Sequence, residues 1–394
     1  MKICHIITRM IIGGAQENTY LTCRGLAERG HEVLLLSGPE TGPEGSLWPV
    51  LESSPFDTKP VDNLRRSIHP MRDWRALRDL TTMIRDFAPD VVHTHSSKAG
   101  ILGRYAAARA KVPAIIHTIH GMSFNRTQTW WRRKVYESLE RSAARKTHGM
   151  ICVADAMTEQ ALAANVGHPS MYTTIRSGME VDTFFADETQ YEAVRSSWGV
   201  QPGTVTIGTI ARLFRNKGYE ELLKAMPLIV DRLPDVRFVW IGDGAQRAEY
   251  TSQLERLGLL DKVHFTGLVR PDQIPGLLRG MDVLVHASRW EGLPRAVVQA
   301  LLSEVPAVSF DNDGAREVIT HGETGFLAPF GDCDALAQAV LDLAADEAVR
   351  SRMGKLGRER CLIPFDWRTM TTEIEKVYDR VLRDEARPAD RARQ

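Results

Sequence analysis

Short runs of β-branched and other apolar residues alternate along the chain with stretches of helical period. In the first half the apolar runs read KICHIIT, EVLLLSG, DVVHTHS, AIIHTIHG, GMICVAD and MYTTIRSG, and stretches such as 71–87 and 97–111 show helical spacing. In the second half they read VTIGTIARL, VRFVWIGDG, KVHFTGLV, MDVLVHAS and PAVSFDND. Strands that are apolar on both faces and separated by helices form parallel sheets. The pattern therefore predicts an α/β fold with two doubly wound, Rossmann-like parallel sheets.

The break between the two sheets is predicted near residues 182–204, where the chain is polar, lacks strand period and includes Pro-Gly. A chain of 394 residues exceeds what one ordinary core organises, so we expect two domains, 1–185 and 186–365. A last helical pattern, 367–383, follows Pro364. It opens a closing segment, 366–394, whose charged tail we expect to fray.

Composition narrows the class of protein. Hydrophobic residues make up 43% and charged residues 25%, as in an ordinary globular protein, and the formal net charge of zero argues against a nucleic-acid binder. Residues 1–185 hold 23 Lys/Arg and 18 Asp/Glu, which leaves 27 and 32 for the rest, so a basic half precedes an acidic one. The five cysteines are scattered and form no CxxC, which favours a reducing cytoplasm over a disulfide framework or a zinc site. The apolar start, MKICHIIT, indicates a first strand and not a signal peptide, and no stretch is long enough to cross a bilayer.

Ligands bind at the carboxyl ends of the strands in open parallel sheets, so the residues after each strand are the candidates for chemistry. Gly13 and Gly14 follow the first strand. Glycines at this position let backbone amides approach a ligand and open a helix whose N-terminus favours anions. A tight turn explains the pair equally well, and because GxGxxG is absent, a nicotinamide site is weakly supported.

Four histidines lie in or after the next strands: His93, His95, His117 and His120. A metal site is one interpretation. However, His93, His95 and His117 alternate within strands, where most histidines are packed or hydrogen-bonded, so we expect these to be structural. His120 ends its strand beside Gly121, and a ligand contact there remains open.

Two cations follow the first strand of the second half, in GTIARLFRNKGYEEL. Arg212 and Lys217 at a strand end and helix start suit a diphosphate, because arginine binds phosphate by its fork and lysine as a point charge. A solvated basic turn is the alternative, and the motif is not a P-loop. Further on, Asp311 and Asp313 form a D-x-D that could hold a metal against a diphosphate. A turn and helix cap is at least as plausible for this pair, because Gly314 and a helical run follow directly.

The stretch VLVHASRWEGLPRAVVQALL reads as strand, loop and helix. Pro294 suits the first helical turn, and Gly292 lets a ligand approach the backbone. Side chains in a helix lean toward its N-terminus, so Gln299 can reach back toward a ligand at the helix mouth. A helix mouth for phosphates, Glu291 for sugar hydroxyls and the Gln299 amide for ribose together predict a sugar-nucleotide site.

At this point the chain resembles the retaining glycosyltransferases of family 4, which have the two-domain GT-B fold. The resemblance covers nearly the whole chain and rests on the order and spacing of several motifs. These are the Gly-Gly turn, HTHSSKAGILGRYAA, HTIHG, IRSGMEVDTF, IARLFRNKG, IGDG, FTGLV, EGLPRAVVQALL and GAREVITHGETGFL. In the family the motif at Glu291 is Glu, seven residues, Glu. Gln299 replaces the second acid here, and an amide can still exchange hydrogen bonds with ribose hydroxyls.

The resemblance implies roles for individual residues. Arg212 and Lys217 would bind the donor diphosphate and His120 would contact the donor sugar; with Glu291 they form the expected catalytic set. The other expected donor contacts are Gly13, Gly14, Gly242, Leu268, Gly292, Leu293, Pro294 and Gln299. The closing helix would cross back to the first domain. No metal and no cofactor are expected, because the cations and the helix mouth already supply positive potential for the diphosphate.

These expectations combine into a retaining transfer of a hexose-type sugar, from a UDP-sugar or similar donor to an acceptor hydroxyl, in polysaccharide or glycolipid synthesis. The alternatives are a sugar-nucleotide epimerase of the same fold and a non-catalytic binding protein. The segment from Trp130 to Lys146 clusters tryptophans with cations and predicts contact with an anionic membrane, with a lipid-linked saccharide as acceptor. The alternative is a solvated helix with Glu137–Arg141 pairing and one buried tryptophan. The sequence gives no oligomeric state.

Overall fold

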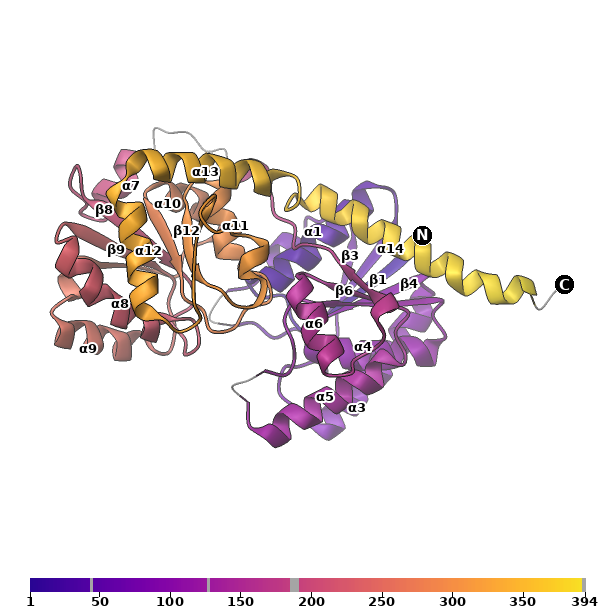
Figure 1. Ribbon diagram of the computed structural model, residues 1–394. Coiled ribbons are helices and arrows are strands. Elements are labelled where there is room, and N and C mark those ends of the chain that lie inside the picture. Colours follow the sequence, from indigo (N-terminus) through magenta and orange to yellow (C-terminus); the bar gives the residue numbers. More distant parts are fainter. Residues whose placement is uncertain (43–44, 126–127, 185–190, 392–394) are drawn as a thin grey trace. The chain divides into compact units, whose positions relative to one another are not determined.

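The computed structural model describes residues 1–42, 45–125, 128–184 and 191–391 (Figure 1). The chain forms two compact units, one made of residues 1–179 with 367 onward, and the other of Glu180–Asp366. The boundary between the two units thus falls after Met179, whereas the sequence pattern predicted it after residue 185. Among the described residues, no helix combines the length and apolar character that a bilayer crossing requires.

The sheet of the first unit has seven parallel strands in the order β3-β2-β1-β4-β5-β6-β7. Their bounds are β1 Lys2–Ile7, β2 Glu32–Ser37, β3 Asp57–Pro60, β4 Val91–His95, β5 Ala114–Ile119, β6 Gly149–Cys152 and β7 Tyr172–Thr174. The strand order reverses between β1 and β4, so the carboxyl ends of these two strands flank a crevice of the kind that binds ligands.

Helices cover both faces of this sheet. They are α1 Gly14–Glu28, α2 Trp48–Leu51, α3 Pro70–Phe87, α4 Ser97–Ala110, α5 Trp130–Ala144, α6 Asp155–Ala163 and α14 Trp367–Arg391. Residues of α1 and α14 share one core cluster with Ile3 and Ile7 of β1, while residues of α3 and α4 share another with Cys4 and Ile6. Alternate residues of β1 therefore face opposite helical layers, as a strand buried on both faces requires.

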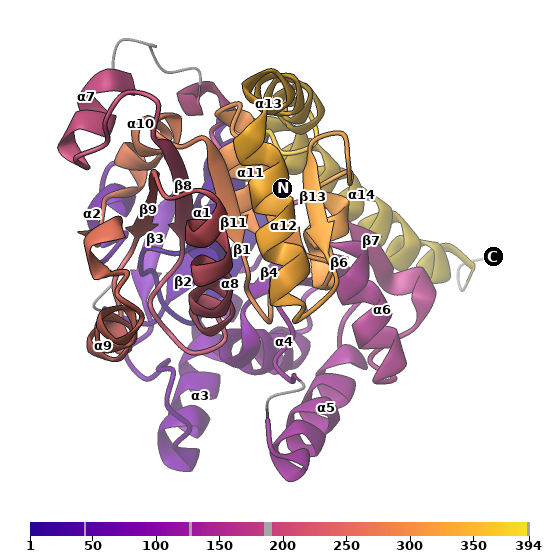
Figure 2. The same ribbon diagram turned by 60° about the vertical axis from the view of Figure 1, so that its left-hand side comes forward.

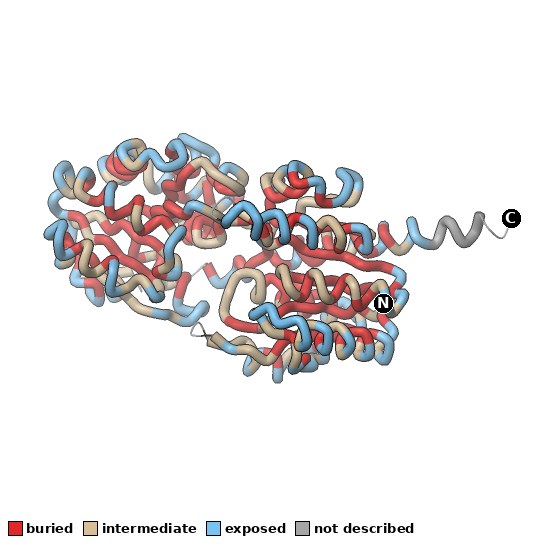
Figure 3. Tube along the Cα trace, turned by 90° about the horizontal axis from the view of Figure 1, so that it is seen from below, coloured by how far each residue is buried: buried red, intermediate tan, exposed pale blue. Residues whose placement is uncertain are grey.

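The second unit has a six-stranded parallel sheet in the order β10-β9-β8-β11-β12-β13. Its strands are β8 Val205–Ile210, β9 Val236–Ile241, β10 Val263–Gly267, β11 Val283–His286, β12 Ala307–Phe310 and β13 Gly325–Ala328. Its helices are α7 Tyr191–Ser197, α8 Tyr219–Arg232, α9 Arg247–Leu257, α10 Ile274–Arg279, α11 Arg295–Leu302, α12 Cys333–Ala345 and α13 Glu347–Leu362 (Figure 2). The central strands of each sheet are buried (Figure 3). The strand order reverses between β8 and β11.

The two doubly wound parallel sheets confirm the predicted fold class. The sequence pattern missed the edge strands β3 and β13 and overlooked a helix inside the predicted break. That helix, α7, packs against α10. Trp198, which follows it, is only 2% exposed. The predicted closing helix is present as α14, and its residues belong to the first unit.

Candidate active site

In the second unit, the residues after β8 and β11 meet at the strand-order reversal. Lys217 follows β8 and Glu291 follows β11, and these strands pair directly. The Lys217 Nζ lies 2.5 Å from Glu291 Oε1, and the two side chains are 27% and 24% exposed. Burial opposes ionisation of the Glu291 carboxyl, but the Lys217 ammonium outweighs it and holds the pKa of Glu291 below its usual value. The two residues that the sequence assigned to the donor site therefore lie in direct contact, and their binding of a donor remains a prediction.

His286, the last residue of β11, is a member of this cluster that the sequence reasoning missed. Its Nε2 lies 3.7 Å from Glu291 Oε1 and has no hydrogen-bond partner among the described residues. The ring is only 6% exposed, and burial lowers the pKa of His286 to about 4. It is therefore a neutral imidazole beside the acid. The available sequence signal was a polar residue ending an otherwise apolar strand.

Backbone contacts fix the two loops against each other. Gly218, at the start of α8, has φ 85°, and a Cβ there would lie 2.1 Å from the carbonyl oxygen of Ala287. The Arg289 amide donates to the carbonyl of Asn216 at 3.0 Å, and Ser288 Oγ donates to the same carbonyl at 3.2 Å. The glycine thus permits the close approach that brings Lys217 to Glu291.

The helix mouth lies where the sequence predicted it. Gly292, Leu293 and Pro294 are buried, Pro294 is the cap residue of α11, and the structure gives this end no side-chain cap. The first amides of an uncapped helix need an acceptor from outside the helix. Gln299 lies within α11 and is partly exposed. A phosphate at the mouth would meet the first backbone amides of α11 and the positive end of the helix dipole.

Asp311 and Asp313 serve the turn and loop. Asp313 Oδ2 accepts a hydrogen bond from the Glu291 amide at 3.0 Å, and Asp311 pairs with Arg316 at 2.6 Å. Asp313 begins a short 3-10 helix, Asp313–Glu317, and has φ 46°. These contacts support the turn interpretation of the D-x-D, and Asp313 helps to hold the loop that carries Glu291.

The other donor candidates lie along the same carboxyl edge. The Arg212 guanidinium lies 4.8 Å from the centre of the Phe214 ring. Gly242 follows β9 with φ 129°, and a Cβ there would lie 2.2 Å from the Ala211 carbonyl oxygen, so close packing alone requires a glycine. Leu268 follows the edge strand β10 and is 54% exposed. Contact of these residues with a donor remains a prediction.

In the first unit, the ends of β1 and β4 are tied together. Thr8 Oγ1 and Ser96 Oγ lie 2.7 Å apart, and the Ala99 amide donates to Thr8 Oγ1 at 3.1 Å. Ser96 caps α4 with φ 60°, a conformation that a non-glycine residue adopts at a cost of about 1 kcal/mol or more and that clusters at functional sites. Gly13 caps α1 with an extended backbone, so the Gly-Gly pair opens the helix as predicted.

A row of histidines runs beneath α14 from β1 through β4 to His120, directly after β5; His5, His93 and His95 in it are buried. His5 Nδ1 lies 2.9 Å from His95 Nε2, and His95 Nδ1 lies 3.1 Å from His120 Nε2. His93 bonds Tyr378 Oη and Thr118 Oγ1, both at 2.6 Å. His5 was missed by the sequence reasoning, although it lies on the same face of β1 as Ile3 and Ile7 and pairs in register with His93.

These contacts confirm the expectation that His93, His95 and His117 are packed, hydrogen-bonded residues. Within the described residues, His5, His93 and His95 form the one group of three whose possible ligand atoms lie within 4.8 Å of one another. Burial lowers the pKa of His5 to about 3 and, with neighbouring histidines, holds the pKa of His93 and His95 well below the usual value. The rings are therefore neutral hydrogen-bond partners.

His117 belongs to a different environment. Its Nδ1 contacts Thr94 Oγ1 at 2.9 Å, and it packs against Gly100 of α4, on the opposite face from His93. His120, by contrast, ends the row at the carboxyl edge and lines a small cavity with Ser96, Ser97 and Ser123. Because His95 is neutral, its tautomer decides whether His120 Nε2 donates or accepts in this contact.

Helix α5 differs from the solvated alternative in one respect. Trp130 and Trp131 are 78% and 53% exposed, so the expectation of one buried tryptophan is wrong. The Glu137–Arg141 pair is present at 3.0 Å. The buried Glu137 also pairs with Arg133 at 2.8 Å and Lys134 at 3.1 Å.

Two family models match the chain. Glycosyl transferases group 1 matches residues 190–360, and the glycosyl transferase 4-like domain matches residues 13–178. Among curated relatives, the Escherichia coli UDP-Gal:alpha-D-GlcNAc-diphosphoundecaprenol alpha-1,3-galactosyltransferase is 27% identical over 383 residues, which is 96% of each chain. The Bacillus subtilis putative glycosyltransferase EpsD is 28% identical over 320 residues, or 80% of this chain and 83% of that protein.

Solved structures agree on the fold. Anabaena HepE, in complex with UDP and glucose, superposes with a TM-score of 0.83 at 21% identity, covering 96% of this chain and 99% of that one. WaaG, a glycosyltransferase involved in lipopolysaccharide biosynthesis, superposes with a TM-score of 0.75 at 16% identity, covering 96% and 99%. With the family models, the two Rossmann-like units and the Lys217–Glu291 site together, the chain belongs to the group 1 glycosyltransferases of GT-B fold and acts with nucleotide-sugar donors.

Proposed function

We propose that this enzyme transfers a hexose from a UDP-sugar to a hydroxyl of a lipid-linked saccharide, retaining the anomeric configuration, in the synthesis of a cell-surface polysaccharide or glycolipid. The observation that carries the donor half is the contact of Lys217 with Glu291 beside the uncapped mouth of α11. The donor and acceptor named for the Escherichia coli relative, which matches over 96% of this chain, support the acceptor half.

The site residues have distinct parts in the proposed reaction. The Lys217 ammonium has three donors, so it can bond a diphosphate oxygen while it keeps Glu291 oriented. Arg212 and the α11 amides add positive potential where negative charge develops on the leaving diphosphate, which is where electrostatic stabilisation counts most. Glu291, held ionised by Lys217, accepts hydrogen bonds from hydroxyls of the transferred sugar, and Gln299 contacts the ribose.

His120 contacts the donor sugar in the proposed complex, and its neutral neighbour His95 sets its orientation. The leaving diphosphate takes the acceptor proton, because Glu291 is engaged with the sugar hydroxyls and the proposed reaction includes no carboxylate base. No metal takes part in this scheme, since the cations already neutralise the diphosphate. Loss of activity in EDTA that Mg²⁺ or Mn²⁺ restores would overturn that part.

A thermal-shift panel of UDP-, GDP-, ADP- and TDP-sugars tests the donor. Ligands that bind only the folded state raise its melting temperature, and we expect the largest rise with a UDP-sugar. Incubation with that donor and a diphosphate-linked saccharide should then release UDP and form a glycoside of unchanged anomeric configuration, read by proton NMR. Interconversion of the donor without UDP release would indicate an epimerase, and an inverted anomeric signal would refute retention.

We further propose that α5 docks on an anionic membrane. Its exposed apolar side chains, Trp130, Trp131, Val135 and Leu139, lie on the same helix as Arg132, Arg133 and Lys134, and aromatics beside cations suit a headgroup layer. Vesicle flotation tests this directly. The Trp130→Ser/Trp131→Ser variant should bind anionic vesicles several-fold more weakly than the unaltered protein, and equal flotation with neutral vesicles would remove the idea.

A further inference from the structure

Two cavities of the first unit share a wall made by Arg9 and Arg66. The first has a volume of about 630 Å³ and is also lined by Glu40 and Arg65. The second has a volume of about 510 Å³ and is also lined by Ser96 and Ile68. Arg9 lies two residues after Ile7, the last residue of β1, so the shared wall lies at the carboxyl edge of the sheet.

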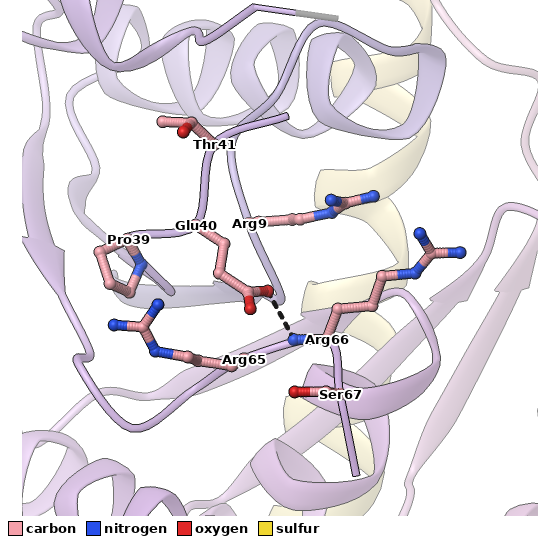
Figure 4. Close-up of a pocket in the computed structure, with 7 residues that line it drawn as sticks. All are labelled: Arg9, Pro39, Glu40, Thr41, Arg65, Arg66 and Ser67. Carbon is pink, nitrogen blue, oxygen red and sulfur yellow. Dashed lines mark hydrogen bonds between the residues drawn. The ribbon is translucent and has the colours of Figure 1, made fainter. Parts of the chain in front are cut away.

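The first cavity is strongly basic. Among the described residues, three arginines line it against one carboxylate, Glu40, whose Oε2 accepts a hydrogen bond from the Arg66 backbone amide at 2.6 Å. In Figure 4 the guanidinium groups of Arg9 and Arg66 lie on one side of Glu40, and that of Arg65 lies on the other. Arginine forks match phosphate oxygens in pairs, so the side with two guanidinium groups suits a phosphate or a diphosphate.

Shared lining residues place His120 near this wall. The small cavity that His120 lines shares Ser96, Ser97 and Ser123 with the second cavity. The second cavity in turn reaches Arg9 and Arg66. A molecule that lies along these cavities can therefore place a sugar hydroxyl near His120 and an anionic group at the arginines.

The second cavity also has an apolar side. Ile68, which is 72% exposed, and Leu139 of α5, which is 39% exposed, both line it. Close to Ile68 along the chain, Met71 and Trp74 at the start of α3 are 58% and 57% exposed, and α4 packs against both α3 and α5. A ligand that joins a phosphate to an apolar chain fits this arrangement better than a free sugar phosphate.

We propose that Arg9 and Arg66 bind the phosphate or diphosphate that links the acceptor saccharide to its lipid. This inference rests on the proposed function and adds to it the groups that select a phosphate-linked acceptor over a neutral one. The lipid leaves the arginines along Ile68 and Leu139, and the sugar extends toward Ser96 and His120. Arg65 adds to the potential from the other side of Glu40.

The test compares two acceptors that carry the same terminal sugar and the same alkyl chain, one joined by a diphosphate and one by a plain glycosidic bond. In the full-length enzyme, Arg66→Gln and Arg9→Gln should each lower the ratio of kcat/KM values, diphosphate acceptor over neutral acceptor, about tenfold or more. Arg78→Gln, at an exposed position of α3 outside both cavities, should leave it unchanged. An unchanged ratio in both cavity variants, or an equal fall in all three, would overturn the proposal.

Two further measurements separate the sources of the phosphate and the two proposals. If the cavity variants lose flotation with anionic phospholipid vesicles as strongly as they lose acceptor selectivity, the arginines bind headgroups and the acceptor assignment is wrong. Calorimetric binding of the diphosphate acceptor needs no turnover. If the wild-type enzyme transfers no sugar from any donor, the proposed function fails. Even then, tenfold weaker binding of the diphosphate acceptor by Arg66→Gln would support the anionic acceptor site, and binding as tight as that of the wild type would refute it.

Discussion

Replacing Lys217 by methionine should weaken binding of a nucleoside diphosphate by about 10- to 100-fold while the fold persists. Methionine keeps most of the apolar stem and removes only the ammonium. A hydrogen bond to a charged group contributes about 1.5–3 kcal/mol, and each 1.4 kcal/mol corresponds to about a factor of ten in the dissociation constant. Arg212 and the α11 amides remain, so binding should be weakened and not abolished.

The same substitution removes the partner of Glu291. Burial would then act on that carboxyl unopposed by the nearest cation, and the pKa of Glu291 should rise. In the wild-type protein this pKa is lowered, so the pair contributes stability above the usual glutamate pKa and loses it as the pH falls. The difference in melting temperature between wild type and variant should therefore be largest near pH 7 and should shrink in acid.

Calorimetric titration with UDP measures the first effect, and melting curves from pH 7 to pH 4 measure the second. Lys224→Met, at an exposed position of α8, is the matched control, because it removes one charge from the same unit without touching Glu291. If Lys217→Met bound UDP as tightly as Lys224→Met and melted with the same pH dependence, the assignment of this loop to the diphosphate would be wrong.

Substitutions at three further positions test separate parts of the structure. Gln299→Glu should keep activity, and Gln299→Ala should raise the donor KM several-fold in initial-rate assays; an inactive but folded Gln299→Glu enzyme would contradict the ribose contact. Gly218→Ala should lower the free energy of unfolding by about 3 kcal/mol, because it adds a clash to an unfavourable φ. Gly203→Ala, at φ 84° with open space around it, should cost about 1 kcal/mol, and equal losses in urea titrations would argue against the close approach to Ala287. The buried, neutral His5 should make the protein less stable as pH falls from 6.5, by about 1.4 kcal/mol per pH unit, because only the unfolded chain takes up its proton. His5→Gln should reduce that slope, and an unchanged slope would show that His5 is not buried as a neutral group.

The sequence pattern located the central strands of both sheets but missed two edge strands, β3 and β13. β3 reads DTKP, is mostly exposed and pairs with β2 through its backbone, so it carries no apolar run. β13 has only four residues, Gly325–Ala328, at the other sheet's edge. Edge strands of this kind depend on a neighbour already in place, which a local pattern does not reveal.

Tertiary contacts also explain why the predicted break between the sheets contains a helix. Arg195 of α7 pairs with Asp282 at 3.0 Å, and Trp198 packs on Gly280, where a Cβ would lie 2.5 Å from its ring. These contacts draw a polar stretch into the second unit. Likewise, motif spacing pointed to Lys217 and Glu291, but His5 and His286 join their clusters through strand register and burial, which the sequence alone does not specify.

The position of α14 has a consequence for how the chain is made. Its Ile374, Val377 and Tyr378 complete the core cluster that also holds Ile3 and Leu21, yet they are synthesised after the whole of the second unit. During synthesis the first unit therefore lacks one wall of its core until α14 emerges from the ribosome. The second unit is one continuous segment, Glu180–Asp366, and all of it emerges earlier. Contacts of such long sequence separation form slowly. The first unit should consequently be the later of the two to mature, and the one more exposed to chaperones and proteases during synthesis.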